Sequence, residues 1–153
     1  MVAYKPEGYP DVSAYLIIDG AAKALDFYTT VFGIKERVRM DGPNGTVGHA
    51  EIDLGDSLLM LADEDPMVDA RGPRKFGGSP VTLCLYVEDV DAVVDRAVQN
   101  GATVLRPVED KFYGDRAGLI EDPFGHRWNV ATHIEDVTPE EMGRRLAALM
   151  PDG

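Results

Sequence analysis

Hydrophobic and polar positions along the chain follow one pattern that occurs twice. Each copy has an apolar strand-like segment, an amphipathic helical segment and three further strand-like segments. Three pairs of matching positions are 69 residues apart: Ser13 and Thr82, Asp53 and Asp122, and Met60 and Asn129. Two copies are too few for a solenoid, which needs at least about three stacked repeats. The two units must therefore pack on each other or on a partner chain.

The first copy is predicted to form a βαβββ unit over about residues 12–64. Residues 12–18 are rich in Ile, Leu and Tyr, which favours a strand. Asp19 is a predicted N-cap, and apolar residues then recur every three or four positions up to Gly33, as in a helix that ends at a glycine. Strands are predicted over residues 34–40, 46–53 and 57–62, because turn sequences rich in Gly, Asp and Pro separate them.

The second copy is predicted over about residues 80–134 with the same order of elements. A strand at residues 81–87 precedes a helix that is capped by Asp89 and ends at Asn100, and strands follow at residues 103–107, 117–121 and 127–132. Residues 65–79, with several Pro and Gly breaks, are predicted to be a linker. The fold class predicted for residues 1–153 is α+β, in a single domain built of the two units.

A final helix is predicted over about residues 138–150, with no counterpart in the first copy. Thr138, Pro139 and Glu141 form a capping box with proline at the first helical position. Met142, Leu146 and Leu149 lie on one side of this helix. We expect that apolar side to be buried, and a symmetric homodimer is one way to bury it.

Charge and composition exclude several classes of partner. The net charge of −12 repels phosphate backbones, so no nucleic-acid partner is expected. No apolar run approaches the roughly 20 residues of a membrane helix, and residues 1–10 lack a signal-peptide core, so a cytoplasmic protein without a membrane partner is expected. The lone Cys84 stands in an apolar run and is predicted to be a small buried hydrophobe rather than a nucleophile.

Four motifs point to a known superfamily: Asp19-Gly-Ala-Ala-Lys-Ala-Leu-Asp-Phe-Tyr28, Gly48-His-Ala-Glu51, Tyr86-Val-Glu-Asp-Val-Asp91 and Asp122-Pro-Phe-Gly-His-Arg-Trp128. With the repeated βαβββ pattern, the chain resembles the vicinal oxygen chelate superfamily of glyoxalases, bleomycin-resistance proteins and extradiol dioxygenases. It is most similar to a glyoxalase-like, PhnB-like bacterial branch. The resemblance implies two half-barrels around a pocket. It does not select a function, because isomerases, oxygenases, lyases and metal-free binders share this fold.

The resemblance also implies where metal ligands would lie. In metal-dependent members the ligands come from the first and last strand of each unit, which places them here at Ser13, Met60, Thr82 and Asn129. Hydroxyl, thioether and amide groups are weak ligands for zinc, iron or nickel. No metal cofactor is therefore expected, and Cys84, two residues from Thr82, is the nearest stronger donor.

His49 and Glu51 are the alternative candidates for chemistry. Residues two apart in a strand point to the same face, so these side chains lie together. They could chelate a divalent metal at a shifted site, or His49 could act as a general base beside the carboxylate. The competing interpretation is a hydrogen-bonded polar pair on a half-buried strand. His126 and His133 are expected to be structural or surface residues at a turn and beyond the last strand.

Strand alternation predicts a ligand pocket of mixed character. The inward positions combine apolar groups with hydroxyls and one amide, as is typical of small-molecule sites, and the residues assigned to it are Ser13, Tyr15, Met60, Thr82, Cys84, Tyr86 and Asn129. The competing interpretation is a solid barrel core. The segment 111–116 could cover the pocket mouth with Tyr113 and Arg116, and Arg116 is expected to bind an anionic ligand or to pair with Asp115.

The function predicted from the sequence is metal-independent binding of a small molecule, such as sequestration of a drug or metabolite, by a homodimer. One alternative is a lyase, isomerase or dioxygenase that uses a shifted metal site or His49 as base. Another is a protein-interaction module in which the terminal helix and the linker dock a partner. Whether the two units close within one chain or exchange across a dimer stays open.

Overall fold

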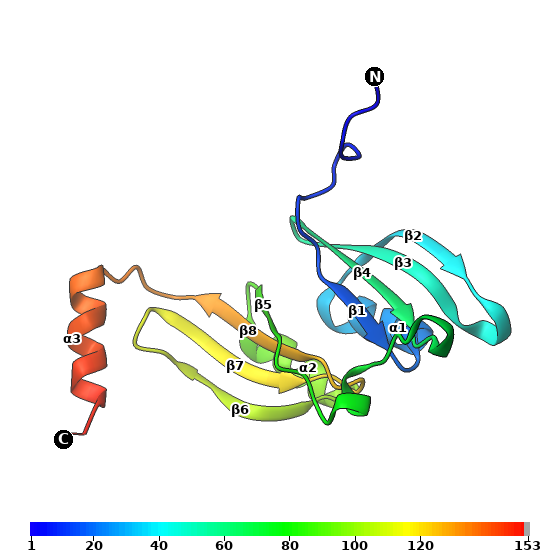
Figure 1. Cartoon of the computed structure of the whole chain (residues 1–153). Helices are drawn as coiled ribbons and strands as arrows, with labels where there is room; N and C mark the ends of the chain where they lie inside the picture. Colours follow the sequence, from blue (N-terminus) through cyan, green and yellow to red (C-terminus); the bar gives the residue numbers. More distant parts are fainter. Residues whose placement is uncertain (152–153) are drawn as a thin grey trace. The chain divides into compact units, whose positions relative to one another are not determined.

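Two four-stranded mixed sheets, each with its own helix, make up the chain (Figure 1). The computed structural model describes residues 1–151. One compact unit comprises Met1–Ser79 with Pro123–Gly125, and the other comprises Pro80–Asp122 with the described residues from His126 onward. Because each unit follows the order βαβββ, the predicted α+β class is confirmed.

The first unit has the strand order β1-β4-β3-β2, with bounds β1 Tyr15–Ile18, β2 Lys35–Asp41, β3 Val47–Leu54 and β4 Ser57–Asp63. β1 runs parallel to β4, and the other neighbours are antiparallel. Helix α1 (Ala21–Phe32) buries one face against this sheet, because its apolar residues recur at helical spacing. The core of this unit contains the fully buried Ile18, Leu25, Tyr28, Ile52 and Leu61.

The second unit has the strand order β5-β8-β7-β6, with bounds β5 Thr82–Tyr86, β6 Thr103–Asp110, β7 Asp115–Glu121 and β8 Arg127–His133. Helix α2 (Val90–Gln99) buries four of its residues, Val90, Val93, Val94 and Ala97. The sheet contributes the fully buried Ile120, Trp128 and Val130 to this core. Three short 3₁₀ segments, Pro43–Gly45, Pro66–Val68 and Pro73–Phe76, complete the first unit.

The offset between the repeats is not uniform, which corrects one of the sequence matches. Asp53 pairs with Leu58, whereas it is Glu121 that pairs with Arg127. The structural counterpart of Asp53 is therefore Glu121, 68 residues later, and not Asp122. The reason is the turn between the last two strands. It is one residue longer in the second unit, where Asp122 N–H donates to the His126 carbonyl across a three-residue loop (2.8 Å).

The motif that begins at Asp122 holds this longer turn. The buried Asp122 carboxylate accepts hydrogen bonds from the His126 backbone N–H and from Trp128 Nε1, both at 3.0 Å. A buried carboxylate is tolerated where such donors satisfy it. This motif is therefore structural in the second unit.

The observed N-cap residue is the one predicted from the sequence at two of the three α-helices in the described chain. Asp89 caps α2 by accepting from Ala92 N–H at 3.0 Å, and Thr138 caps α3 (Pro139–Leu149) by accepting from Glu141 N–H at 3.2 Å. The prediction that Asp19 is the N-cap of α1 is wrong. The N-cap of α1 is Gly20, in the left-handed region at φ 96°, and it makes no side-chain cap.

The carboxylate of Asp63, at the end of β4, takes the place of a local cap on α1. Its Oδ1 accepts from Gly20 N–H and Ala21 N–H at 3.0 Å each, and its Oδ2 accepts from Val47 N–H at 2.7 Å. One side chain therefore satisfies the start of α1 and the start of β3 together.

Helix α3 does not bury its apolar side within the described chain, and burial of this side in a homodimer stays a prediction. None of its residues is buried, and Leu146 and Leu149 are exposed. The helix is held instead by Arg145, which pairs with Glu135 at 2.7 Å and donates to the Phe112 carbonyl at 3.3 Å. None of the helices within residues 1–151 combines the length and apolar character needed to cross a membrane.

Candidate functional site

A cavity of about 380 Å³ opens on the second unit, on the sheet face that does not contact α2. The pairing of residues across β5, β8 and β7 explains which side chains line this cavity. Thr82 and Cys84 of β5 lie beside Arg127 and Asn129 of β8, and Asn129 lies beside Leu119 of β7. The residues that line the cavity include Thr82, Cys84, Tyr113, Ala117, Leu119 and Asn129. Four residues predicted from the sequence, Thr82, Cys84, Tyr113 and Asn129, therefore meet at one cavity.

The expectation that Cys84 is buried is wrong. Its thiol is exposed on the cavity side of β5. Alternation along the strand explains the difference, because the half-buried Leu83 and Leu85 take the positions on the opposite side. The apolar run around Cys84 thus places half-buried leucines on one face of the strand and the cavity residues Thr82 and Cys84 on the other.

Three cationic residues line the same cavity, and the sequence reasoning did not identify any of them as site residues. They are Arg106, Lys111 and Arg127. Arg127 lies two residues before Asn129 on the same strand, so alternation was a usable signal for it. Arg106 could not be placed in this way, because register shifts interrupt β6 on both sides of it.

The hairpin between β6 and β7 presents Lys111 and Tyr113 at the cavity. Lys111 N–H donates to the Asp115 carbonyl at 2.7 Å, and Gly114 N–H donates to the Lys111 carbonyl at 3.1 Å. Gly114 has φ 98°, and a Cβ there would lie 2.1 Å from the Glu135 carbonyl oxygen. Only glycine fits this close approach, which holds the hairpin against the chain that follows β8.

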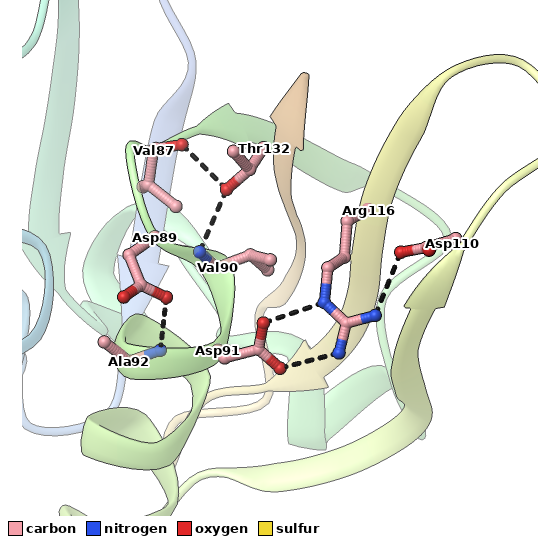
Figure 2. A network of polar contacts seen from close by, with 8 residues as sticks. All are labelled: Val87, Asp89, Val90, Asp91, Ala92, Asp110, Arg116 and Thr132. Atoms are coloured by element: carbon pink, nitrogen blue, oxygen red, sulfur yellow. Dashed lines mark hydrogen bonds and ion pairs between the residues drawn. The ribbon is translucent and has the colours of Figure 1, made fainter. Parts of the chain in front are cut away.

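Arg116 does not line this cavity, and the prediction that it could pair with Asp115 is wrong. Figure 2 shows its guanidinium between two other carboxylates: Asp91 at 2.8 and 2.9 Å, and Asp110 at 2.9 Å. These contacts raise the pKa of Arg116, with Asp91 the main cause, and the Arg116 charge holds the pKa of Asp91 below its usual range. Asp115 and Arg116 are adjacent in β7 and so face opposite sides of the sheet.

The remaining contacts in Figure 2 hold the start of α2. Thr132 Oγ1 donates to the Val87 carbonyl and accepts from Val90 N–H, both at 2.9 Å. Together with the Asp89 cap and the Arg116–Asp91 pair, they connect the helix to β7 and β8. The role of Arg116 in the described structure is therefore to position α2.

Tyr86 belongs to a second polar cluster of this unit. Its hydroxyl donates to Asp115 Oδ2 at 2.7 Å, and the other oxygen of Asp115 contacts His133 Nδ1 at 2.8 Å. His133 Nε2 contacts Asp136 at 2.8 Å. Asp115 is only 6% exposed and Tyr86 is 65% exposed. Hydrogen bonding to Asp115 raises the pKa of Tyr86, and contacts with Asp136 and then Asp115 raise the pKa of His133.

In the first unit, the structure brings His49 and Glu51 together, as predicted from their spacing. His49 Nε2 lies 3.1 Å from Glu51 Oε1, and His49 Nδ1 lies 2.8 Å from the Tyr15 hydroxyl. The Tyr9 hydroxyl donates to the other oxygen of Glu51 at 2.5 Å. Four side chains thus form one hydrogen-bonded chain, Tyr15–His49–Glu51–Tyr9.

Electrostatics favour an ionised Glu51 in this chain, although the residue is only 8% exposed. Hydrogen bonds from Tyr9 and then His49 hold the pKa of Glu51 below its usual range. The same contact with Glu51 raises the pKa of Tyr9, and burial followed by the Glu51 charge raises the pKa of Tyr15. Tyr9 was missed in the sequence because residues 1–11 precede the repeat and contain no strand or helix pattern.

Ser13 and Met60 flank this chain of side chains. Met60 pairs with Tyr15 on one side and with Glu51 on the other, so it shares their face of the first sheet. Ser13 lies before the start of β1 and is half-buried, which corrects the predicted strand start at residue 12.

The donor groups do not fit a divalent metal site of the kind implied by the superfamily. The implied positions Ser13, Met60, Thr82 and Asn129 hold two hydroxyls, a thioether and an amide. Both ring nitrogens of His49 already contact Tyr15 and Glu51. Within residues 1–151, no group of three or more His, Cys, Asp or Glu residues is placed to hold a metal ion.

Comparison with known proteins gives the family. The chain matches the Glyoxalase/Bleomycin resistance protein/Dioxygenase superfamily over residues 12–130, and it belongs to that superfamily. The Mycobacterium tuberculosis protein Rv0887c is 40% identical over 142 residues, which cover 91% of this chain and 84% of that protein.

Solved structures agree with this assignment. The Arabidopsis thaliana protein At5g48480 superposes with a TM-score of 0.66 at 27% identity, over 80% of this chain and 98% of that chain. A PhnB protein from Bacillus cereus superposes with a TM-score of 0.64 at 20% identity, over 80% of this chain and 99% of that chain. At that identity the second likeness shows a shared fold alone.

Proposed function

We propose that this protein binds a small molecule in the cavity of the second unit without using a metal ion. The observation that carries the proposal is the cavity of about 380 Å³, whose lining includes Thr82 and Asn129. These residues stand where metal-dependent members of the superfamily have ligands, and here they border open space. The volume lies within the range of ligand pockets, roughly 300–1,000 Å³.

The lining supports binding rather than a packed core. Leu119 offers an apolar surface, and Thr82, Tyr113 and Asn129 offer hydrogen-bonding groups around it. Apolar area supplies affinity at such sites, and a few polar groups fix orientation. Sequestration of a drug or metabolite fits this arrangement, because it requires no activated nucleophile, base or Lewis acid.

A thermal-shift screen of small molecules tests the proposal, with Asn129→Leu as the cavity variant. Met60→Leu is the matched control, since Met60 occupies the equivalent strand position in the first unit. A ligand at a hundred times its dissociation constant stabilises the native state by roughly 2.7 kcal/mol. We expect that stabilisation to fall in Asn129→Leu and to persist in Met60→Leu. Hits that are indifferent to Asn129→Leu would argue against this cavity.

The metal-free part of the proposal has its own measurement. Melting with and without zinc, nickel, iron(II) and manganese should leave the midpoint unchanged, because the implied ligand positions carry weak donors. A rise of several degrees with stoichiometric metal uptake, lost in His49→Ala or Glu51→Ala, would contradict it and point to a shifted metal site.

A second candidate function is acid–base chemistry at His49. The hydrogen-bonded chain from Tyr15 to Tyr9 favours it, because Glu51 orients the imidazole and a phenol hydroxyl lies against its other nitrogen. The same screen separates the two candidates. A ligand whose stabilisation is lost in His49→Gln and retained in Asn129→Leu would assign function to the first unit.

A further inference from the structure

The charge of the cavity is opposite to that of the protein. The chain carries a net charge of −12, yet the cavity lining contains Arg106, Lys111 and Arg127 and no carboxylate. The nearest acidic partners of these cations are Glu109, which pairs with Lys111 at 2.5 Å, and Glu121, which lies 3.6 Å from Arg127 Nε. Neither glutamate contributes to the lining.

Two of the three cationic side chains have N–H groups that no acceptor in the described chain satisfies. Within residues 1–151, the Arg106 guanidinium makes no hydrogen bond or ion pair. Arg127 Nε is buried and has no hydrogen-bond partner in the described chain, because 3.6 Å to Glu121 is too long for one. Glu121 is the nearest acidic group to this nitrogen, and the Arg127 side chain is one of the residues that line the cavity.

Strand register places these donors around an apolar floor. Arg106 pairs with Leu119, Leu119 pairs with Asn129, and Asn129 pairs with Cys84, so one row crosses the sheet from β6 to β5. Arg127 and Thr82 are paired two residues along the strands, in the next row on the same face of the sheet. Lys111 and Tyr113 reach the cavity from the β6–β7 hairpin. A ligand over Leu119 would therefore lie between Arg106 on the edge strand β6 and the side chains of Arg127 and Asn129 on β8.

We infer that the cavity selects small molecules that carry an oxyanion group on a compact apolar body, with Arg106 and Arg127 binding the oxyanion. This inference rests on the proposed function and adds the chemical class of the ligand. Guanidinium groups suit carboxylate and phosphate oxygens, because their planar donors match both. Leu119 contacts the apolar body.

Matched aromatic probes test the charge requirement directly. Benzoate and phenyl phosphate carry the two oxyanion types, benzamide is the neutral analogue, benzylamine is the cation, and inorganic phosphate lacks the apolar body. Calorimetric titration at low salt should show binding of benzoate or phenyl phosphate, with benzamide and benzylamine at least tenfold weaker. The stronger of the two anions identifies the oxyanion type, and affinity should fall as salt is raised.

Arginine variants assign the binding to the cavity. Loss of one hydrogen bond to a charged partner corresponds to roughly a ten- to hundredfold loss of affinity, so Arg106→Gln and Arg127→Gln should each weaken the anionic probe by about that factor. Arg144→Gln removes the same charge from exposed α3 and should change little. Arg106 is exposed, so its variant should fold even if Arg127→Gln does not.

The outcomes separate this inference from the proposed function. Equal binding of benzoate and benzamide, with loss in Asn129→Leu, would overturn the charge requirement and leave the cavity as the binding site. Anion binding that is unchanged in Arg106→Gln would overturn the assignment to these residues. Absence of binding by every probe would overturn the inference, while the screen with Asn129→Leu decides the proposed function independently.

Discussion

At the residue scale, the partners of a side chain decide its role in this protein. Arg116 was a ligand-binding candidate, but Asp91 and Asp110 occupy its guanidinium. Arg127, from the last strand, instead lines the cavity, and its Nε lies 3.6 Å from Glu121, too far for a hydrogen bond. Residue type alone does not distinguish the two arginines. Their places in β7 and β8 distinguish them. Side chains alternate between the two faces of a strand, so the place of each arginine decides which carboxylates it can reach.

The stability of the protein should depend on pH through His133. Contacts with Asp136 and Asp115 raise the pKa of His133, so its protonated form stabilises the folded state. That contribution is fully present below the unfolded pKa, about 6.5, and is lost as pH rises through the higher folded value. We expect His133→Gln to lower the melting temperature more at pH 5.5 than at pH 9.

Two further variants control this prediction. Asp136→Asn removes the contact that contributes most to the raised pKa and should reproduce part of the His133→Gln effect. Asp11→Asn removes the same charge near the N-terminus, where it pairs with Lys5, and should not change the pH profile. A melting-temperature difference that is constant from pH 5.5 to pH 9 would contradict the role of His133.

At the element scale, helices follow local patterns, but their ends can depend on distant residues. The apolar face of α1 is evident in the sequence, whereas its first N–H groups are satisfied by Asp63, more than 40 residues away. A sequence motif can reveal a cap only when the capping side chain is local, as with Asp89 and Thr138.

Asp63→Ala should destabilise the protein by about 1–3 kcal/mol, because three backbone N–H groups lose a charged acceptor. Asp19→Ala is the matched control, since Asp19 is the local candidate for this cap but is exposed and does not cap α1. Urea unfolding of both variants measures the difference. A larger loss in Asp19→Ala than in Asp63→Ala would show that the local cap is the functional one.

At the scale of the whole molecule, exposed apolar groups favour self-association. The edge strands β2 and β6 are almost wholly exposed and carry Met40, Val104 and Leu105, and α3 carries Leu149. Edge strands and apolar faces of this kind are normally covered by another element or chain. Burying them against a second copy satisfies both partners by symmetry.

We therefore expect a homodimer at micromolar concentration, with twice the 16.7 kDa mass of the chain. Light scattering across a dilution series measures this mass. Leu149→Glu and Leu105→Glu should each shift the equilibrium toward the monomer if α3 or β6 contributes to the interface. A mass near 16.7 kDa at every concentration would contradict the prediction.

The sequence by itself determined the two βαβββ units, the faces of their helices, the pairing of His49 with Glu51, and the superfamily. These features depend on periodicity and on residues close together in the chain, where geometry follows directly from spacing. Thr82, Cys84 and Asn129 could be assigned to one sheet face for the same reason.

Only the tertiary structure decided which polar groups meet. Strand register brought Arg106 beside Leu119, a one-residue difference in turn length shifted the match of Asp53 to Glu121, and the β4 carboxylate of Asp63 replaced the predicted cap. Bulges, turn lengths and contacts over 40 residues or more are not encoded in any local pattern, because they follow from the packing of whole strands and helices.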